Sequence, residues 1–359
     1  MTQRQSLSLD DIAAKAGVSR STVSRVVNEH PNVSPQTRAR VLRVIDEEKY
    51  RPNAAARIMV TRRTEVIGVV IPHDLQVVFW DPYYYPALLQ GVSEATGERD
   101  YAMLLWVRQS GEDEERFYRR VLQHGLMDGL IVASARIHGT FIDRLLDIGV
   151  PFAMVERAPR HADRISYATI DNVEAARQIV DHLAAAGRRR IGLITGEIDN
   201  VDSIDRLEGY RASLQRLGLP DDLVAEGDFS RKSAYAATSA LLERGVDAIF
   251  ASNDIMAQGV YDRLHEAGLR VPDDVAVVGF DDLPTATQLK PLLTTVRQPV
   301  RDKGYRATEL LLRQIDQSDA APQHIILPAS LIIRESCGAM PSAKSDSHPR
   351  SPQTRAASG

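Results

Sequence analysis

Two arginines in the segment RSTVSR, residues 20–25, could make specific contacts with base edges in double-stranded DNA. Arginine pairs bidentately with the O6 and N7 atoms of guanine, so Arg20 and Arg25 are candidates for this contact. The serine and threonine hydroxyls between them are short groups of the kind that contact phosphate oxygens. These residue types at this spacing indicate recognition of a nucleic acid.

A second set of polar residues follows short apolar runs much later in the chain. Glu156 comes after PFAMV, Asn253 after AIFAS and Asp281 after VAVVGF. Ligand sites in open parallel sheets lie beyond the carboxyl ends of the strands. Acceptors combined with an arginine fork, here Arg206, suit a polyhydroxylated ligand because each hydroxyl both donates and accepts a hydrogen bond. Asp254 fits a helix cap as well as a ligand contact.

The arginines need a helix to present them, and the surrounding sequence predicts one. Ser8 and Asp11 form a capping-box pattern that opens a first helix, which Gly17 ends. Ser19 is placed to cap a second helix that carries residues 20–25 and has an apolar stripe of valines. In a helix-turn-helix unit, the N-terminal residues of the second helix enter the major groove.

A third helix is predicted from Ser34 to about Tyr50, because serine is a good cap and proline suits the first helical position. Val41, Leu42 and Ile45 are expected to face inward. The three helices fit an all-α helix-turn-helix headpiece, and the alternative is a generic three-helix bundle with surface arginines.

The charge of the chain is distributed unevenly. Residues 1–63 contain 12 Lys and Arg against six Asp and Glu, a net charge of +6, whereas the remainder contains 32 against 42, a net charge of −10. A basic segment on an acidic body suggests a polyanionic partner for that segment alone, and a solvated basic face is the alternative.

The segment after the headpiece, residues 53–59, is predicted to be a short helix of marginal stability. Pro52 ends the preceding structure and Asn53 can cap a new helix. Because helix nucleation is costly and few hydrogen bonds follow, this helix should form only when something else holds it.

Beyond about Thr64 the sequence alternates between short apolar runs and helical periodicity. The runs are EVIGVVIP, YAMLLWV, GLIVAS, PFAMVE, RIGLITG, AIFASND and VAVVGFDD. Strands that are buried on both faces and alternate with helices predict parallel sheets. So many strands fit two α/β lobes better than one sheet. The predicted architecture is therefore a two-lobed periplasmic-binding-protein-like core.

The stretch SLDDIAAKAGVSRSTVSRVVNEHPNVSPQTRARVLRVIDEEKYRPNAAARIM resembles the headpiece of the LacI–GalR family of bacterial repressors. The resemblance implies that Arg20 and Ser21 distinguish operators and that Arg25 contacts a base. It also implies a hinge helix that orders on DNA, with Met59 as an apolar wedge between base pairs in the minor groove. Ile58 is an alternative wedge, and packing of both side chains on the core is a further alternative.

Later segments, RLEGYRASLQRLGLP, FASNDIMAQGVYDRLHEAGLRVPDDVAVVGFDDLP and LLTTVRQP, resemble the same family. The resemblance implies an allosteric sensor whose chain crosses between lobes near Ala168, Arg297 and Pro328. Gln298, at such a crossing, is a further candidate ligand contact. The resemblance places four residues at positions that contact effectors in sugar-responsive members: Glu156, Arg206, Asn253 and Asp281.

The loop HDLQVVFWDPYYYP is longer than the short Asn-Pro-Phe-like turn that is usual in the family. Trp80 and the three tyrosines could form an aromatic platform for a sugar face, with Tyr83 and Tyr84 as the candidate contacts. Packing of these rings in the core is the alternative.

These expectations divide the chain into a headpiece at 1–52, a hinge helix and linker at 53–63, an effector-binding and dimerisation domain at 64–338, and a disordered tail at 339–359. In the large domain, the N-lobe is expected at 64–168 and 298–328 and the C-lobe at 169–297 and 329–338. The candidate DNA contacts are Ser19, Arg20, Ser21, Thr22, Ser24, Arg25, Asn28, Asn53 and Met59. The candidate effector contacts are Tyr83, Tyr84, Glu156, Arg206, Asn253, Asp281 and Gln298.

Composition narrows the remaining possibilities. Hydrophobic residues make up 43% and charged residues 26%, and no apolar run approaches the length of a membrane span. No signal peptide precedes the headpiece, and the single cysteine, Cys337, cannot form an intrachain disulfide. The bacterial cytoplasm, at the nucleoid, is therefore the expected location.

The expected partners are palindromic operator DNA, a small effector (a sugar or sugar phosphate) and a second copy of the chain in a homodimer, with no membrane, cofactor or metal. One alternative, an exported solute-binding protein of a sugar transport system, predicts a signal peptide. The other, a Rossmann-type enzyme, predicts a Gly-x-Gly-x-x-Gly motif after a strand, which is not found. The sequence therefore predicts a regulator, by default a repressor of carbohydrate-use genes, and not an enzyme.

Overall fold

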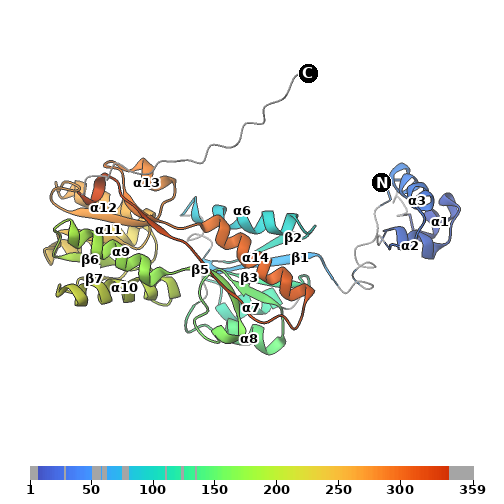
Figure 1. The fold of residues 1–359 in the computed structure, drawn as a ribbon, viewed down its shortest axis with the longest axis horizontal. Helices are drawn as coiled ribbons and strands as arrows, with labels where there is room; N and C mark the ends of the chain where they lie inside the picture. The colour runs from blue at the N-terminus through green and yellow to red at the C-terminus, as the bar shows by residue number, and fades with distance from the viewer. Residues whose placement is uncertain are drawn as a thin grey trace, which may run out of the picture. The chain divides into compact units, whose positions relative to one another are not determined.

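The computed structural model describes residues 7–27, 30–50, 58, 63–74, 81–109, 111–122, 125–133 and 136–338. The chain divides into two compact units, residues 1–65 and residues 66–359. The first unit contains the headpiece, and we call the second the core unit. Figure 1 labels their helices and several of their strands.

The headpiece contains three helices, α1 (Leu9–Ala16), α2 (Arg20–Val27) and α3 (Pro35–Glu47). The predicted capping box is confirmed, because Ser8 Oγ accepts from the Asp11 N–H while the Asp11 carboxylate accepts from the Ser8 N–H. The predicted stop is also confirmed, since Gly17 ends α1 in the left-handed conformation with φ 62°. Local capping therefore fixes the length of α1.

A small apolar core joins the three helices, and its buried members are Ile12, Ala13, Ala16, Val23, Val26 and Val41. The prediction that Leu42 faces inward is wrong, because this residue is 49% exposed. Ile45 packs against the core as predicted, and Val44 does so too. Val44 and Ile45 lie three and four residues after Val41 and so share its helix face. Leu42, directly after Val41, is rotated by about 100° around the helix axis.

The core unit contains two six-stranded sheets, one in each lobe. The N-lobe sheet is parallel, in the order β11 (His324–Leu327), β5 (Ser166–Ile170), β4 (Phe152–Met154), β3 (Gly129–Val132), β1 (Val66–Asp74) and β2 (Ala102–Arg108). The C-lobe sheet has the order β12 (Ser330–Ile332), β10 (Thr294–Arg297), β9 (Ala276–Asp281), β8 (Ala248–Ala251), β6 (Ile191–Ile194) and β7 (Val224–Ala225). Only β12 pairs antiparallel in it. The predicted class, two α/β lobes with parallel sheets, is confirmed.

Helices cover both faces of each sheet. The N-lobe has α6 (Tyr84–Gly97), α7 (Glu114–Leu122), α8 (Phe141–Ile148) and α14 (Val300–Asp316). The C-lobe has α9 (Asn172–Ala185), α10 (Val201–Leu217), α11 (Arg231–Glu243), α12 (Asp254–Glu266) and the short α13 (Pro284–Gln288). Short 3-10 turns lie at Ala162–Arg164 and Glu335–Cys337.

Strand side chains alternate between the two helical layers. In β1, Ile67, Val69 and Ile71 pack in one cluster with α6 and α14, whereas Val70 packs in another with α7 and α8. In β9, Val278 and Phe280 pack with α9 and α10, while Val277 packs with α11 and α12. This two-sided burial explains why the strands read as continuous apolar runs in the sequence.

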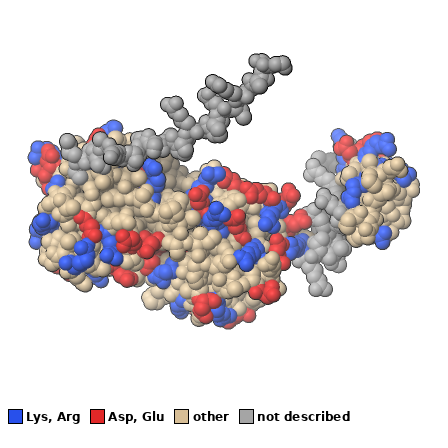
Figure 2. Space-filling model, in the orientation of Figure 1, with Lys and Arg blue, Asp and Glu red and all other residues tan. Residues whose placement is uncertain are grey.

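The chain passes between the lobes three times: after β5, after β10 and after β11. The first passage follows Ile170, slightly beyond the expected position at Ala168. Charged side chains of both signs are interspersed over the visible face of the core unit in Figure 2. On that face, the net negative charge of the core unit therefore does not form a single acidic patch.

Gly91 on α6 and Gly304 on α14 let these two helices approach closely. A Cβ atom added to Gly91 would lie 1.9 Å from the carbonyl oxygen of Arg301, and one added to Gly304 would lie 2.3 Å from that of Leu88. Because both obstacles are backbone atoms, no side-chain movement can relieve the clash.

The Gly91→Ala variant is expected to lose about 1–3 kcal/mol of unfolding free energy in urea denaturation, the usual cost of overpacking. Gly97→Ala on the same helix is the matched control, since nothing lies within 4 Å of its added Cβ. The control should be neutral or slightly stabilised, because alanine has the higher helix propensity. Equal losses in both variants would contradict the close approach.

Candidate functional site

Hydroxyl groups gather at the N-terminus of α2. The Thr22 N–H donates to Ser19 Oγ at 3.2 Å, which confirms Ser19 as the predicted cap. Ser19 Oγ also lies 2.8 Å from Ser21 Oγ and 2.9 Å from Thr22 Oγ1. Helix N-termini favour phosphate because their N–H groups and dipole point at an anion, so this end of α2 suits a DNA backbone.

Arg20, Ser21 and Arg25 are exposed on α2. Arg20 Nη1 lies 3.4 Å from Asp10 Oδ2 on α1, and the two side chains are 67% and 64% exposed. Such an exposed ion pair contributes little to stability, so Asp10 orients Arg20 without fixing it.

The structure describes some of the remaining candidate DNA contacts and not others. Thr22 and Ser24 are half-buried on α2. Ile58, the alternative wedge, is helical and 37% exposed. Asn28, Asn53 and Met59 lie outside the described residues.

Polar side chains from both lobes meet in a set that we call the interlobe cluster. Each comes from a segment that follows a parallel strand, where strand ends and helix starts are adjacent. All are buried except the half-buried Tyr84. The members are Tyr84, Glu156, Asn172, Asp202, Arg206, Asp281, Gln298 and Lys303.

Arg206 on α10 is the centre of the C-lobe half of the cluster and is 3% exposed. Its Nε donates to Asn172 Oδ1 at 3.0 Å and its Nη1 to the Ser252 carbonyl at 2.6 Å, while Nη2 lies 3.7 Å from Asp202 Oδ2. The guanidinium also stacks 3.7 Å from the centroid of the Phe280 ring. A buried guanidinium is tolerated because these partners replace its water.

Lys303 on α14 is the fully buried cation of the N-lobe half. Its Nζ donates to Gln298 Oε1 at 3.1 Å and to the Tyr84 hydroxyl at 3.3 Å, and lies 4.0 Å from Asp202 Oδ2 across the lobes. Gln298 Nε2 in turn donates to Asp281 Oδ1. A chain of hydrogen bonds thus links α6, α14 and β9 through the residue at the second crossing.

Asp281 ends β9 in an unusual backbone conformation, with φ 112°, and Asp282 follows with φ 55°. Positive φ costs a non-glycine residue of the order of 1–3 kcal/mol and is held only where the surroundings enforce it. Here Arg334 and Arg297 each bind the buried Asp282 carboxylate at 2.6 Å. The strained turn aims the Asp281 carboxylate at Gln298.

Burial raises the pKa of Asp281 to about 7, although nearby Arg206 opposes the shift. Burial and the neighbouring Asp281 also raise the pKa of Asp254 well above its usual value. The pKa of Tyr84 is raised by burial and by three nearby carboxylates, those of Glu156, Asp202 and Asp281. The cluster is therefore an environment that disfavours negative charge.

Two buried hydroxyls near the cluster have no hydrogen-bond partner within the described part of the chain. They are Thr195 Oγ1, directly after β6, and Ser203 Oγ, next to Asp202 in the first turn of α10. A buried hydroxyl without a partner costs about 1–3 kcal/mol. A polar ligand could satisfy both.

Asn253 and Asp254 are used inside the protein. Asn253 caps α12, because its Oδ1 accepts from the Met256 N–H at 2.7 Å while its Nδ2 donates to the Phe229 carbonyl. Asp254 accepts from the Leu283 N–H at 3.0 Å and from the Thr295 hydroxyl at 2.6 Å. Its carboxylate therefore joins α12 to β10.

The three tyrosines of the first loop do not form one platform. Tyr85 is 8% exposed in the N-lobe core, and Tyr84 packs edge-on against it at 5.4 Å between ring centroids. Tyr83 points elsewhere and accepts a hydrogen bond from Gln288 Nε2 at 3.0 Å. Trp80 lies outside the described residues.

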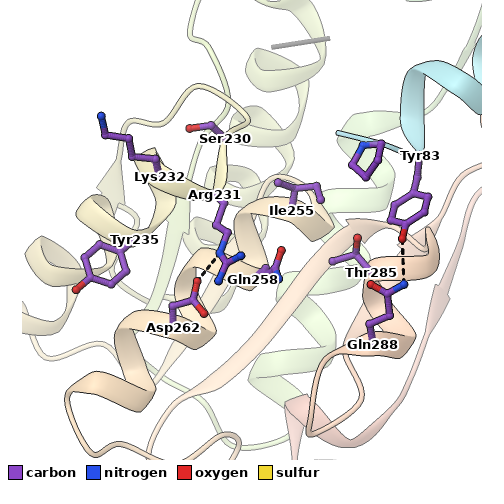
Figure 3. Close-up of a pocket in the computed structure, with 11 residues that line it drawn as sticks. Tyr83, Ser230, Arg231, Lys232, Tyr235, Ile255, Gln258, Asp262, Thr285 and Gln288 are labelled. Atoms are coloured by element: carbon purple, nitrogen blue, oxygen red, sulfur yellow. Dashed lines mark hydrogen bonds and ion pairs between the residues drawn. The ribbon is translucent and has the colours of Figure 1, made fainter. Parts of the chain in front are cut away.

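Tyr83 lines a pocket of about 570 Å³, drawn in Figure 3. The other walls come from the start of α11, from α12 and from α13, and include Ser230, Ile255 and Thr285. Its Arg231 already binds Asp262 at 2.5 Å, and both side chains are substantially exposed. None of the other predicted effector contacts lines this pocket.

Further contacts join the lobes beside the cluster. Arg157, after β4, binds Asp205 of α10 through two hydrogen bonds of 3.1 and 2.5 Å. The His138 N–H donates to Asp199 Oδ1 at 3.1 Å. These contacts hold the lobes together around the cluster.

Three members of the cluster were not predicted from the sequence: Asn172, Asp202 and Lys303. Asp202 lies four residues before Arg206 on the same helix, and this spacing is a signal that could have identified Asp202. Lys303 gives no such signal, because a lysine in an amphipathic helix is normally exposed.

Within the described ranges, no group of three or more His, Cys, Asp or Glu side chains could hold a metal ion. Among the helices that the structure describes, none combines the length and apolar character that a membrane crossing requires.

Two family models match the chain: the bacterial regulatory proteins of the lacI family over residues 8–53, and the periplasmic binding protein-like domain over residues 180–337. The HTH-type transcriptional regulator CelR of Thermobifida fusca is 39% identical over 344 residues, which cover 94% of this chain and 100% of that protein. The chain belongs to the LacI family of bacterial transcription regulators. The predicted resemblance is thereby confirmed.

Solved structures of LacI-family regulators share the fold. A complex of the transcriptional regulator CelR with cellobiose aligns with a TM-score of 0.72 at 36% identity, covering 92% of this chain and 99% of that one. The lac repressor dimer bound to operator and the anti-inducer ONPF aligns with a TM-score of 0.81 at 27% identity, covering 93% and 100%. These relatives are DNA-binding regulators, and this chain is one too; the alternative of a transport protein finds no support among them.

The Asp281 carboxyl makes the stability of this LacI-family regulator depend on pH. Between about pH 4 and pH 7 the unfolded chain releases a proton that the folded chain keeps, so stability falls as pH rises through this window. The slope from this group is at most about 1.4 kcal/mol per pH unit. Asp281→Asn should remove it.

The measurement is the difference in unfolding free energy between the natural protein and Asp281→Asn at pH 4.5 and pH 7.5. The unfolding free energy of the variant, relative to that of the natural protein, should be higher at pH 7.5 than at pH 4.5. Asp222→Asn, which changes a 72% exposed side chain, is the control and should give no such gain. A difference that stays constant with pH would contradict the raised pKa.

Proposed function

We propose that this LacI-family regulator represses carbohydrate-use genes, binds a palindromic operator as a homodimer, and responds to a small sugar. The observation that carries the proposal is the capped, exposed start of α2, where Arg20 lies next to the Ser19 hydroxyl cluster, with Arg25 exposed in the last turn of the same helix. The net charge of +6 on residues 1–63 supports the attraction of DNA to this unit.

The proposed division of labour follows the chain. Residues 1–52 bind the operator, 53–63 form the hinge helix and linker, 64–338 bind the effector and dimerise, and 339–359 form a tail. In the major groove, Arg20, Ser21 and Arg25 read bases, while Ser19, Thr22 and Ser24 contact phosphates. Asn28, Asn53 and Met59 complete the proposed DNA contacts, with Met59 as the minor-groove wedge.

The interlobe cluster is the proposed effector site. Its buried charges and the two hydroxyls without partners, Thr195 and Ser203, support a polar ligand there. The pocket beside Tyr83 is a weaker site, because its Arg231 is already paired and exposed to solvent. Cellobiose in the complex of the related CelR regulator supports a sugar as the ligand class. The proposed contacts are Tyr84, Glu156, Arg206, Asp281 and Gln298, with Tyr83 and Asn253 at the periphery.

The ligand is proposed to be bound and released unchanged, because the cluster's role is to report lobe closure. A ligand that prefers one lobe arrangement biases the separation of the two hinge helices in the dimer. It acts only through its difference in affinity for the two states, and about 1–3 kcal/mol changes operator affinity roughly 5- to 150-fold.

The edge strand β2 supports the homodimer. Met103 and Leu105 on this strand are 36% and 39% exposed, although both are large and apolar. An exposed apolar edge strand is a site of association unless something covers it. A second copy of the chain is the proposed cover, as a twofold dimer matches a palindromic operator.

Arg25→Ala is expected to lower affinity for the operator by about 1–3 kcal/mol while leaving the affinity for scrambled duplex DNA largely unchanged. Fluorescence anisotropy with both duplexes at moderate salt measures this. Arg270→Ala in the core unit removes the same charge from an exposed side chain and is the control. Equal loss on both duplexes would refute base readout.

Leu105→Lys is expected to convert the dimer to a monomer, because a charge at this position would be buried in the interface. Light scattering after size exclusion gives the mass. Ile326→Lys is the matched control, since Ile326 is 55% exposed on β11, the opposite edge of the same sheet. If both variants remain dimers, β2 is not in the interface.

A further inference from the structure

The charges of the interlobe cluster determine which kind of sugar it can accept. Two cations, Arg206 and Lys303, share the cluster with the acids Glu156, Asp202 and Asp281; because the pKa of Asp281 is about 7, the charged acids at least balance the bases at neutral pH. Asp81, 9% exposed, acts on Asp281 as a further like charge. An anionic ligand would therefore meet a surrounding without net positive charge.

Both cations are already engaged. Arg206 uses Nε and Nη1 on Asn172 and the Ser252 carbonyl, and Lys303 uses its ammonium on Gln298 and Tyr84. Asp202 lies 3.7 Å from the first cation and 4.0 Å from the second. A phosphate entering the cluster would therefore have to compete with a built-in carboxylate for each positive charge.

Helix N-termini are the usual alternative for binding phosphate. The short α13 and the N-lobe helix α14 start without a side-chain cap, and four further helices begin at this edge of the C-lobe. Each of them is closed by its own cap. Asp171, Asn200, Ser230 and Asn253 accept hydrogen bonds from the first-turn N–H groups of α9, α10, α11 and α12, respectively. The first turns of α10 and α12 also contain acids, Asp202 and Asp254. At these four helices the caps already use one or two first-turn N–H groups, so fewer remain for a phosphate.

Neutral hydroxyls near the cluster remain available to a ligand. Thr195 Oγ1 and Ser203 Oγ are buried and, within the described residues, without partners. Each hydroxyl can donate one hydrogen bond and accept others, which complements a sugar hydroxyl. The carboxylates accept from sugar hydroxyls without needing a charge on the ligand.

We infer that the interlobe cluster selects an uncharged sugar and rejects the phosphorylated form of the same sugar. The inference rests on the proposed function, because it concerns the proposed effector site. A phosphate group carries a charge of about −1.5 to −2 at pH 7, and like charges opposed in a buried site are strongly unfavourable. The regulator therefore responds to sugars that enter unmodified rather than to products of sugar phosphorylation.

The test uses pairs of ligands that differ only in a phosphate: cellobiose with cellobiose 6-phosphate, glucose with glucose 6-phosphate, and ribose with ribose 5-phosphate. Thermal shift of the full-length protein finds the responsive pair, and titration calorimetry at pH 7.5 gives both affinities. The neutral sugar should bind, and its phosphate should bind at least about 100-fold more weakly. Inorganic phosphate is included as a separate probe and should give no thermal shift.

Asp202→Asn removes one carboxylate. The ratio of the affinity for the neutral sugar to the affinity for its phosphate should fall at least about five-fold in this variant. Asp222→Asn, the matched change at an exposed position of the same lobe, should leave the ratio unchanged. The ratio is measured within each variant, so a general loss of stability does not mimic the effect.

The outcomes distinguish a failure of the charge selection from a failure of the proposed sugar effector. A phosphorylated sugar that binds as tightly as its neutral partner, or more tightly, overturns the charge selection and leaves the sugar-responsive regulator standing. If no member of any pair binds while operator binding persists, the proposed sugar effector fails, and the charge selection fails with it.

Discussion

Buried charges between the two lobes must be paired inside the protein, and the arrangement of the core unit depends on this requirement. Moving Arg206 and Lys303 out of water is costly unless carboxylates and amides replace the lost hydration. Those partners come from α9, from α10 and from Gln298 between β10 and α14, so both lobes have to close on the same few side chains. A network shared between two lobes is a natural place for a ligand to alter their relative stability.

The headpiece is built on the opposite plan. Its core is a handful of small apolar side chains, and capping hydrogen bonds set the start of each helix. The charged and hydroxyl groups remain outside, on α2, where water can be exchanged for DNA. The binding chemistry of the two units thus differs: exposed cations in the headpiece suit a polyanion, and a buried acidic cluster in the core unit suits a neutral ligand.

Strain and closed caps meet at the same edge of the C-lobe sheet. Asp281 and Asp282 adopt positive φ there, and arginine pairs on Asp282 hold the turn in place. The nearby helices satisfy their own first-turn amides through Asn200, Ser230 and Asn253. Such a preorganised edge needs little rearrangement when a ligand binds. The binding free energy therefore remains available for closing the lobes.

The sequence by itself determined the features that depend on neighbouring residues. Capping patterns placed α1, α2 and α3, continuous apolar runs identified two-sided strands such as β1 and β9, and polar residues after those strands marked Glu156 and Asp281. The strands β7, β11 and β12 were missed because they are only 2, 4 and 3 residues long, too short to show a period. Only the tertiary structure decided that Lys303 is buried beside Gln298, that Leu42 is exposed, and that Asn253 is engaged as a cap. These outcomes depend on which distant segments pack together, and helical periodicity or strand alternation carries no information about that.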